Sequence, residues 1–372
     1  MNTTPARVLM TTDTVGGVFS YATSLSEALT RRGIEVMLVS MGPPASDDQR
    51  RQLAGMRGLR FVETTYRLEW MDDPWADVEQ AGAKLLQLER SFQPDLVHLN
   101  GYVHGSLPFA APTLVVAHSC VLSWWQAVKD EPAPLHYSNY RERVRRGLLQ
   151  ADMVVAPTHA MRELLVQHYG RLPLVRVLPN GCDLNTFTPG TKQPLIAAAG
   201  RAWDEAKNLA ALMHIADALP WPVTIAGDLT MPAAAAGPRA SATAACVGRL
   251  SQAQLAQLLA QSAIYAAPAL YEPFGLSILE AAASGCALVL GDIPSLRELW
   301  SEAALFVPPH DEQALRSALV RLIDDEPLRS KLALSALQRA ARYSQTSFAD
   351  GYLELYRSLL KHRRSSTGNL HA

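Results

Sequence analysis

Residues 7–40 read RVLMTTDTVGGVFSYATSLSEALTRRGIEVMLVS, and their pattern indicates the fold class. Its first part, Arg7–Thr12, is a short apolar run typical of a buried strand. The glycine pair Gly16 and Gly17 then opens a helix, which ends at Gly33. A second apolar run, Glu35–Ser40, predicts the next strand. A strand, a helix and a strand in this order are typical of a parallel sheet built from βαβ units.

The same alternation continues in two blocks along the chain. Strands of the first block are predicted at Leu59–Glu63, Leu96–Leu99, Thr113–Ala117, Met153–Ala156 and Leu174–Leu178, and its helices at Val78–Phe92, Tyr137–Gln150 and Ala160–Tyr169. Strands of the second block are predicted at Leu195–Ala199, Pro222–Ala226, Ala244–Val247, Ile264–Ala266, Ala287–Leu290 and Ala304–Val307, and its helices at Asn208–Ala218, Gln252–Gln261, Leu276–Ala283 and Gln313–Ile323. Between the blocks, Pro179–Pro194 is rich in turn residues and predicts a linker.

The chain has 372 residues, and at about 150 residues per domain this length favours two domains. We therefore predict two doubly wound α/β domains that face a cleft, the first over residues 1–185 and the second over residues 186–345. A helix and a frayed tail occupy residues 346–372. Pro327–Lys361 is expected to be wholly helical, and the low-complexity stretch Met231–Ala245 to be a surface loop.

Composition excludes several classes of protein. Hydrophobic residues at 48% and charged residues at 19% exclude a disordered or fibrous chain. Thirty-four Lys and Arg against 35 Asp and Glu leave a net charge of −1, so nucleic acid is not expected as a partner. The four cysteines are scattered, which gives neither a disulfide framework nor zinc spacing and favours a reducing compartment. Without a signal sequence or an apolar run of about 18 residues, we predict a soluble cytoplasmic protein, with peripheral membrane contact left open.

The most informative segment for function is YEPFGLSILEAAASG at Tyr271–Gly285. Glu272 lies in a tight loop just before a helix that begins near Leu276, and Glu280 follows within that helix. Two carboxylates beside the free N–H groups of a helix N-terminus suit a ligand that offers both hydroxyls and phosphate. The alternative interpretation is an acid favoured by the helix dipole and a solvated glutamate.

A second candidate segment, GRAWDEAKN, directly follows the predicted strand Leu195–Ala199. Ligands of open parallel sheets bind at the carboxyl ends of the strands. Arg201 and Lys207 would place two cations there, which suits a diphosphate. Two ordinary surface cations are the alternative.

In the first block, Gly16 and Gly17 let the backbone approach a ligand at a helix N-terminus. The pair does not form G-x-G-x-x-G, so a conventional NAD dehydrogenase is disfavoured. His118 ends an apolar strand on the same side. A simple strand-to-helix turn explains the glycines equally well, and a lone histidine after a strand is more often structural. His98 and His104 rank lower. No nucleophile-elbow, zinc-protease, Walker or kinase signature is present.

In this order the segments resemble the family 4 retaining glycosyltransferases of the GT-B fold, which have two Rossmann-like domains. The motifs that carry the resemblance are Asp13–Val18, His118, Val177–Asp183, Gly200-Arg201 with Lys207-Asn208, and Glu272-Pro-Phe-Gly-Leu276 with Glu280, the Glu-x7-Glu pattern of the family. They span roughly residues 7 to 360.

The resemblance implies a role for each matching position. Arg201 and Lys207 would hold the diphosphate of a nucleotide-sugar, Glu280 the ribose hydroxyls and Glu272 the transferred sugar. His118 would lie near the reacting centre. Further donor contacts would come from backbone at Gly16, Gly17, Val247, Gly248, Leu250, Phe274, Gly275 and Leu276.

The resemblance also implies transfer with retention of configuration, no metal and no other cofactor. The helix Thr346–Lys361 would return to the first domain. UDP-glucose is the first expectation for the donor, with a GDP-sugar left open. A UDP-sugar epimerase of the same fold and a non-catalytic nucleotide-sugar-binding protein are the alternatives.

The acceptor is a hydroxyl compound that the sequence does not identify. Trp124 and Trp125 are candidates for stacking on it, or else fill a gap beneath the cleft. His98 and His104 are further candidates on the acceptor side. The basic run Arg141–Arg146 would meet anionic lipid if the acceptor is lipid-linked, and is otherwise a solvated helix face.

Overall fold

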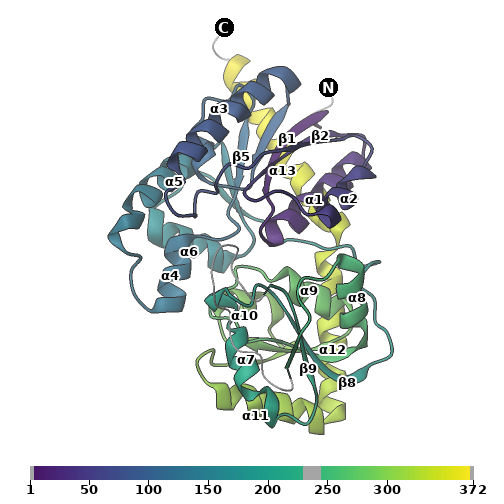
Figure 1. Ribbon diagram of the computed structural model, residues 1–372. Coiled ribbons are helices and arrows are strands. Elements are labelled where there is room, and N and C mark those ends of the chain that lie inside the picture. The colour runs from purple at the N-terminus through teal and green to yellow at the C-terminus, as the bar shows by residue number, and fades with distance from the viewer. Residues whose placement is uncertain (1–3, 229–243, 369–372) are drawn as a thin grey trace. The chain divides into compact units, whose positions relative to one another are not determined.

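The computed structural model describes residues 4–228 and 244–368, and for 363–368 the backbone alone. Within it the chain forms two compact units (Figure 1). Unit 1 consists of Met1–Ser123, Pro132–Asn180 and Gln345–Ala372, and unit 2 consists of Trp124–Glu131 and Gly181–Ser344. Most of the predicted loop Met231–Ala245 lies outside the described residues.

Unit 1 contains a seven-stranded sheet in the order β3-β2-β1-β4-β5-β6-β7, and every pairing in it is parallel. Its strands are β1 (Arg7–Asp13), β2 (Glu35–Met41), β3 (Leu59–Glu63), β4 (Leu96–Leu99), β5 (Thr113–Val116), β6 (Met153–Ala156) and β7 (Val175–Val177). The central strands are buried on both faces, which is why they read as continuous apolar runs.

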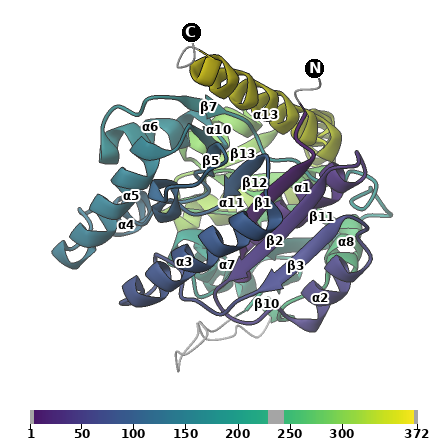
Figure 2. The same ribbon diagram turned by 90° about the horizontal axis from the view of Figure 1, so that it is seen from above.

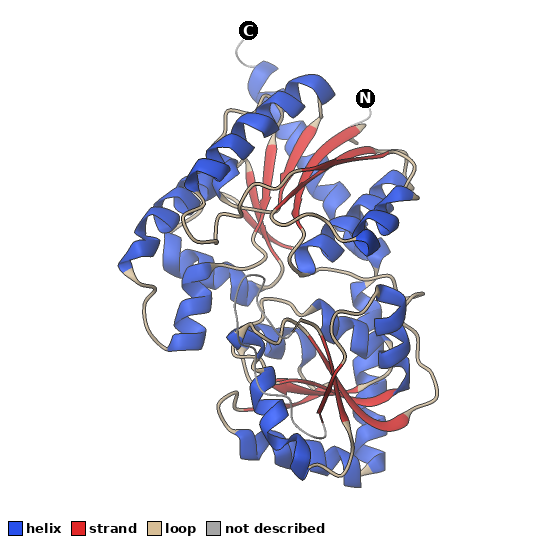
Figure 3. Ribbon diagram, viewed as in Figure 1, coloured by secondary structure: helices blue, strands red, loops and turns tan. Residues whose placement is uncertain are grey.

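The helices of unit 1 flank this sheet (Figure 3). They are α1 (Gly17–Thr30), α2 (Asp47–Ala54), α3 (Trp75–Phe92), η1 (Val103–Ser106), η2 (Leu135–Tyr137), α5 (Ser138–Gln150), α6 (His159–Tyr169) and α13 (Gln345–Gly368). Helix α4 (Val121–Lys129) is divided between the units after Ser123. Helix α1 buries Ala22, Leu25 and Leu29, and burial of each leucine contributes about 1.5–3 kcal/mol.

Unit 2 repeats the arrangement with six parallel strands in the order β10-β9-β8-β11-β12-β13. Its strands are β8 (Gln193–Ala199), β9 (Val223–Ala226), β10 (Ala244–Cys246), β11 (Ser262–Ala267), β12 (Ala287–Gly291) and β13 (Ala304–Val307). Its helices are η3 (Glu205–Lys207), α7 (Leu209–Ile215), η4 (Ala216–Ala218), α8 (Gln252–Gln261), α9 (Leu276–Ala283), α10 (Pro294–Trp300), α11 (Glu312–Asp324) and α12 (Glu326–Ala340). The parallel α/β class predicted for both blocks is confirmed.

The expectation of one unbroken helix over Pro327–Lys361 is wrong. Helix α12 ends at Ala340 and passes through the short helix η5 (Ala341–Tyr343) before α13 begins at Gln345. Between them, Ser344 forms a β-bridge with Cys182, and the Cys182 N–H donates to the Tyr343 carbonyl at 3.1 Å. Pairing with another segment therefore takes the backbone out of the helix at this point. Helix α13 also continues past Lys361 to Gly368, where a frayed tail was expected.

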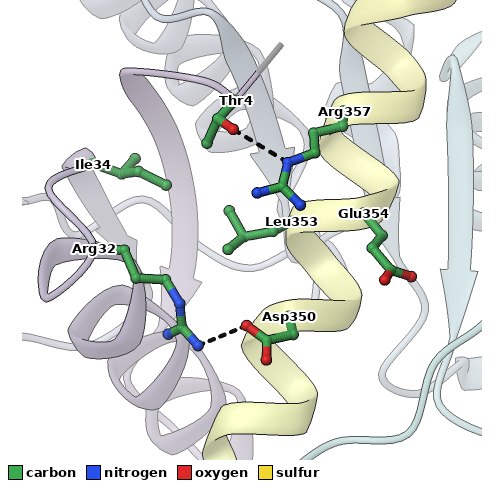
Figure 4. Close-up of a pocket in the computed structure, with 7 residues that line it drawn as sticks. All are labelled: Thr4, Arg32, Ile34, Asp350, Leu353, Glu354 and Arg357. Atoms are coloured by element: carbon green, nitrogen blue, oxygen red, sulfur yellow. Dashed lines mark hydrogen bonds and ion pairs between the residues drawn. The ribbon is translucent and has the colours of Figure 1, made fainter. Parts of the chain in front are cut away.

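Helix α13 belongs to unit 1 and lies beside α1 (Figure 2). Its apolar face is buried through Phe348, Tyr352 and Tyr356. At its edge, Arg32, in the turn that follows α1, pairs with Asp350 at 2.7 Å across a hollow of about 430 Å³ (Figure 4). These contacts give the apolar stripe of the last helix its partner.

A close backbone approach joins α5 to η1 in unit 1. A Cβ atom at Gly147 of α5 would lie 1.9 Å from the Tyr102 carbonyl oxygen. We expect Gly147→Ala to destabilise the protein by at least about 2 kcal/mol, although alanine is the better helix former. The expected fall in Tm is several degrees, measured by thermal unfolding.

Gly55→Ala is the matched control for Gly147→Ala. A Cβ atom at Gly55 meets nothing within 4 Å, and its φ of −88° suits alanine. Equal midpoints for the two variants would contradict the close approach.

Candidate functional site

The site in unit 2 begins where the strand order reverses. Strand β8 lies between β9 and β11, so the chain builds the sheet outward from β8 in both directions. Loops at the carboxyl ends of the two strands beside such a reversal diverge and leave room for a ligand. Arg201 and Lys207 follow β8, and Glu272 follows β11.

An ion pair joins these two loops. Lys207 Nζ donates to Glu272 Oε2 at 2.5 Å, with both side chains largely buried. The Leu270 N–H also donates to the Ala206 carbonyl at 2.8 Å, and Ser295 Oγ donates to the Glu272 carbonyl at 2.5 Å. The structure therefore brings together two residues that lie far apart in the sequence and were both predicted for the site.

Asp204 organises the loop that carries Arg201. It pairs with Arg201 at 2.6 Å, and its Oδ1 accepts hydrogen bonds from the Ala206 N–H at 3.1 Å and from Trp124 Nε1 at 3.0 Å. Burial favours the neutral acid, but the charges of Arg201 and Lys207 outweigh burial and hold the pKa of Asp204 below its usual value. Sequence reasoning missed Asp204, whose only signal is its place inside GRAWDEAKN.

The N-terminus of α9 lies directly after Glu272. Gly275 precedes the helix with a φ of +86°, in the left-handed region where any other L side chain would be strained. Among the described residues no side chain caps this helix end. Phe274 is buried and Leu276 half-buried, and the uncapped backbone N–H groups of this turn are available to a ligand.

Glu280 lies one turn into α9 and is largely shielded from water. Burial raises the pKa of Glu280 to about 8. Hydroxyl groups that donate hydrogen bonds to Glu280 would stabilise its charged form and so lower this pKa.

The carboxyl ends of β9 and β10 lie at the same edge of the sheet as that of β8, because the three strands are parallel. Gly227 after β9 packs on the Gly200 backbone, where a Cβ would come within 1.8 Å of the Gly200 carbonyl oxygen. The Gly227 N–H donates to the Gly248 carbonyl at 2.8 Å. Val247 is 45% exposed and Leu250 is half-buried, so both remain open to contact.

Unit 1 has its own reversal, between β1 and β4. Gly16 and Gly17 follow β1, and Asp13 Oδ1 accepts the Val15 and Gly16 N–H groups at 3.0 and 3.3 Å. Helix α1 starts at Gly17, which is exposed, and no described side chain caps it. Its first turn therefore presents backbone donors.

His118 follows β5 beside this reversal and is half-buried. Its Nε2 lies 2.8 Å from Oδ1 of Asn100, a residue that follows β4. Burial lowers the pKa of His118 to about 3, so the imidazole is neutral. Asn100 was also missed from the sequence, where an asparagine after a strand gives no distinguishing signal.

The residues predicted for the acceptor side have different surroundings in the structure. His98 is fully buried between Tyr21 and Tyr356, at 3.2 and 2.7 Å from their hydroxyls, and has no exposed surface for an acceptor. His104 lies 2.9 Å from the Val78 carbonyl and borders a hollow of about 490 Å³ formed by α3, η1 and α5. In unit 2, Trp124 contacts Asp204, and Trp125 donates to Glu131 at 3.2 Å.

The basic run lies on α5. Arg143 pairs with Glu79 at 3.1 Å and stacks over Trp75, with its guanidinium 4.6 Å from a ring centroid. Arg141, Arg145 and Arg146 are exposed. Lipid contact by this run stays a prediction.

Within residues 4–228 and 244–368, no group of three or more His, Cys, Asp or Glu side chains is gathered to hold a metal ion. No helix of that part of the chain is long and apolar enough to cross a membrane. All four cysteines are free thiols, three of them buried and Cys246 partly exposed.

Comparisons with known proteins identify the class. Residues 15–186 match the model of Glycosyltransferase Family 4, and residues 193–325 match that of Glycosyl transferases group 1. Two α/β units with parallel sheets, each with candidate site residues where its strand order reverses, are typical of GT-B glycosyltransferases. The chain belongs to family 4 of these enzymes.

Curated relatives agree with this class. Glycogen synthase of Mycobacterium tuberculosis is 25% identical over 87% of this chain and 86% of its own. A D-inositol 3-phosphate glycosyltransferase of Xylanimonas cellulosilytica is 27% identical over 95% and 94%.

Solved structures share the fold. Sucrose-phosphate synthase from Thermosynechococcus elongatus superposes with a TM-score of 0.81 at 18% identity, covering 96% of this chain and 99% of that one. Anabaena HepE in complex with UDP-glucose superposes at 0.76 with 18% identity, over 95% and 99%.

The raised pKa of Glu280 predicts a pH-dependent stability. The folded value of about 8 exceeds the ordinary value of about 4.3, so the folded protein holds this proton more tightly. The contribution is complete at low pH and is lost as the pH rises through about 8. We expect Tm of the ligand-free protein to fall between pH 5 and pH 9 more steeply than in Glu280→Gln.

Thermal unfolding at a series of pH values measures this difference. Glu163→Gln, which changes an exposed glutamate of α6 in the same way, should keep the wild-type slope. A Glu280→Gln slope equal to that of the wild type would show that Glu280 is not the group responsible.

Proposed function

We propose that this glycosyltransferase moves a glucosyl group from UDP-glucose to a hydroxyl group of a glycan, lipid-linked or small-molecule acceptor. The transfer retains the anomeric configuration and uses no metal ion. The observation that carries the proposal is the Lys207–Glu272 pair at the reversal point of unit 2. In this pair, the Lys207 ammonium group, which would bind phosphate, lies beside the Glu272 carboxylate, which would accept hydrogen bonds from sugar hydroxyls.

The donor assignment rests on two kinds of support. HepE was solved with UDP, with UDP and glucose, and with UDP-glucose, and it shares the fold of this chain. In this chain, Arg201 and Lys207 supply two positive charges at the loop after β8. The partly buried Glu280, one turn into α9, supplies a carboxyl group for the ribose.

The two cations are already paired with carboxylates, Arg201 with Asp204 and Lys207 with Glu272. These pairs hold the cationic side chains in place and limit the cost of keeping them partly buried. A bound diphosphate would add acceptor oxygens to the free N–H groups of Arg201 and Lys207. Glu272 would remain beside the sugar to accept its hydroxyls.

The transfer breaks the bond between C1 of glucose and the β-phosphate oxygen and forms a bond from C1 to the acceptor oxygen on the same face. The leaving phosphate takes the proton of the acceptor hydroxyl. Arg201, Lys207 and the N-terminus of α9 offset the charge that grows on UDP. His118 offers a neutral imidazole near the sugar.

Removing one cation tests the assignment of the donor site. We expect Lys207→Ala to lower kcat about 10²–10³-fold, the usual cost of losing a charge-stabilising group. The measurement is initial-rate release of UDP with acceptor present. Lys331→Ala, on the exposed face of α12, is the matched control and should keep the wild-type rate. Wild-type kcat in Lys207→Ala would remove this site assignment.

The donor and the metal requirement are tested together by thermal shift. A ligand that binds only the folded protein raises Tm. UDP and UDP-glucose should raise Tm more than GDP, ADP and their sugars, and EDTA should change neither the shift nor the rate. A shift confined to GDP compounds would overturn the donor. Activity lost in EDTA and restored by Mn²⁺ would overturn the metal-free mechanism.

Stereochemistry and acceptor dependence complete the test. The anomeric coupling constant of the product, read by NMR, should be that of an α-glucoside. An inverted product would contradict retention, and conversion of UDP-glucose to another UDP-sugar without acceptor would show an epimerase instead.

A further inference from the structure

We propose that Asn100 is a positioning residue, which holds His118 as the neutral tautomer with its proton on Nε2. The unprotonated Nδ1 is then left to accept a hydrogen bond from a hydroxyl group of the sugar substrates. The inference rests on the proposed function, because it assigns a protonation state to His118, a side chain of the proposed site.

The orientation of the Asn100 amide is set by β1. Asn100 Nδ2 donates to the Thr11 carbonyl at 2.6 Å, and the Asn100 N–H donates to Thr11 Oγ1 at 2.8 Å. Strands β1 and β4 are neighbours in the sheet, so this loop is tied to a rigid element. Because the amide nitrogen is used on Thr11, the oxygen Oδ1 faces His118.

The amide oxygen decides the tautomer of His118. Oδ1 can only accept a hydrogen bond, so the Nε2 atom 2.8 Å away must carry a hydrogen. A neutral imidazole has one such hydrogen, which leaves Nδ1 with its lone pair free. Nδ1 makes no hydrogen bond to any residue in the described part of the chain, and the ring is half-buried rather than enclosed.

The surroundings keep the ring uncharged. Tyr21 of α1 meets it edge-on, with ring centroids 4.4 Å apart, and His98 of β4 lies behind Tyr21. Tyr352 and Tyr356 of α13 pack on His98 in turn. Burial lowers the pKa of His98 to about 3 and raises the pKa of each of the three tyrosines, so these neighbours are neutral near pH 7.

This state limits what His118 does chemically. A neutral imidazole that resists protonation is a poor general acid and a weak base, so proton transfer is left to the phosphate. Its Nδ1 instead recognises a hydroxyl group. A sugar that lacks the contacted hydroxyl would leave Nδ1 unpartnered and would bind less well.

The tautomer is observable directly by NMR. In protein labelled with ¹⁵N-histidine, long-range ¹H–¹⁵N spectra distinguish a protonated from a bare ring nitrogen, and His118→Gln assigns the signals. We expect Nε2 protonated and Nδ1 bare, with no titration between pH 5.5 and 8.5. A proton on Nδ1, or a titration in that range, would overturn the proposal.

Asn100→Asp tests the positioning through activity. The change puts a carboxylate at Nε2, which stabilises the imidazolium and should raise the pKa of His118 toward or above 6.5. The protonated ring no longer offers Nδ1 as an acceptor. Relative to the wild type at the same pH, we expect kcat of Asn100→Asp to fall about fourfold at pH 6, where a group of pKa 6.5 is about three-quarters protonated, and to recover by pH 8.5.

Asn139→Asp, the same change on the exposed start of α5, is the matched control and should keep the wild-type pH profile. If Asn100→Asp does not fold, as judged by circular dichroism, the NMR result on the wild type still decides. An unchanged pH profile in a folded Asn100→Asp, with His118→Ala inactive, would refute the positioning role alone. Full activity in His118→Ala would instead refute the place of His118 in the proposed function.

Discussion

The order in which the chain lays down its parallel strands is the constraint on which the candidate site depends. Each sheet grows outward in both directions from its first strand, β1 in unit 1 and β8 in unit 2. The loops beside that strand diverge, and the backbone donors of following helices face the space between them. In unit 2 the Lys207–Glu272 pair bridges this gap, so one ion pair sets the spacing of the cation and the carboxylate that the proposed chemistry requires.

In unit 1, histidine and tyrosine side chains pack together near the point where the strand order of the sheet reverses. His98 is buried against three tyrosines and His118 is half-buried against one of them, and this would be costly if any of these groups were charged. The structure avoids this cost by hydrogen-bonding His98 to Tyr21 and Tyr356 and by giving His118 the Asn100 oxygen. Because Tyr356 belongs to α13, the last helix of the chain supports the residues around the candidate site as well as covering unit 1.

The sequence predicted the elements with strong periodicity and missed the ones without it. All predicted strands occur, and the central ones are the easiest to predict because buried parallel strands are continuous apolar runs. Helix α2, which begins at a capping box at Ser46, was missed because only Gln49 and Leu53 of its residues are buried, so it shows no apolar period. Helix α10 is seven residues long, too short for a helical period to stand out. The break at Ser344 depends on a β-bridge to Cys182, a contact that no local pattern reveals.

For the candidate site, the chemical groups can be read from the sequence alone: two cations, a spaced glutamate pair, a histidine after a strand, and glycines that let backbone approach a ligand. These follow from residue type and from their place after strands, which local sequence encodes. Three features needed the folded structure: the pairing of Lys207 with Glu272, the hydrogen bonds of Asp204 and Asn100 to their neighbours, and the burial of His98. The physical reason is that hydrogen bonds, burial and pKa depend on distances between residues that the fold alone brings together.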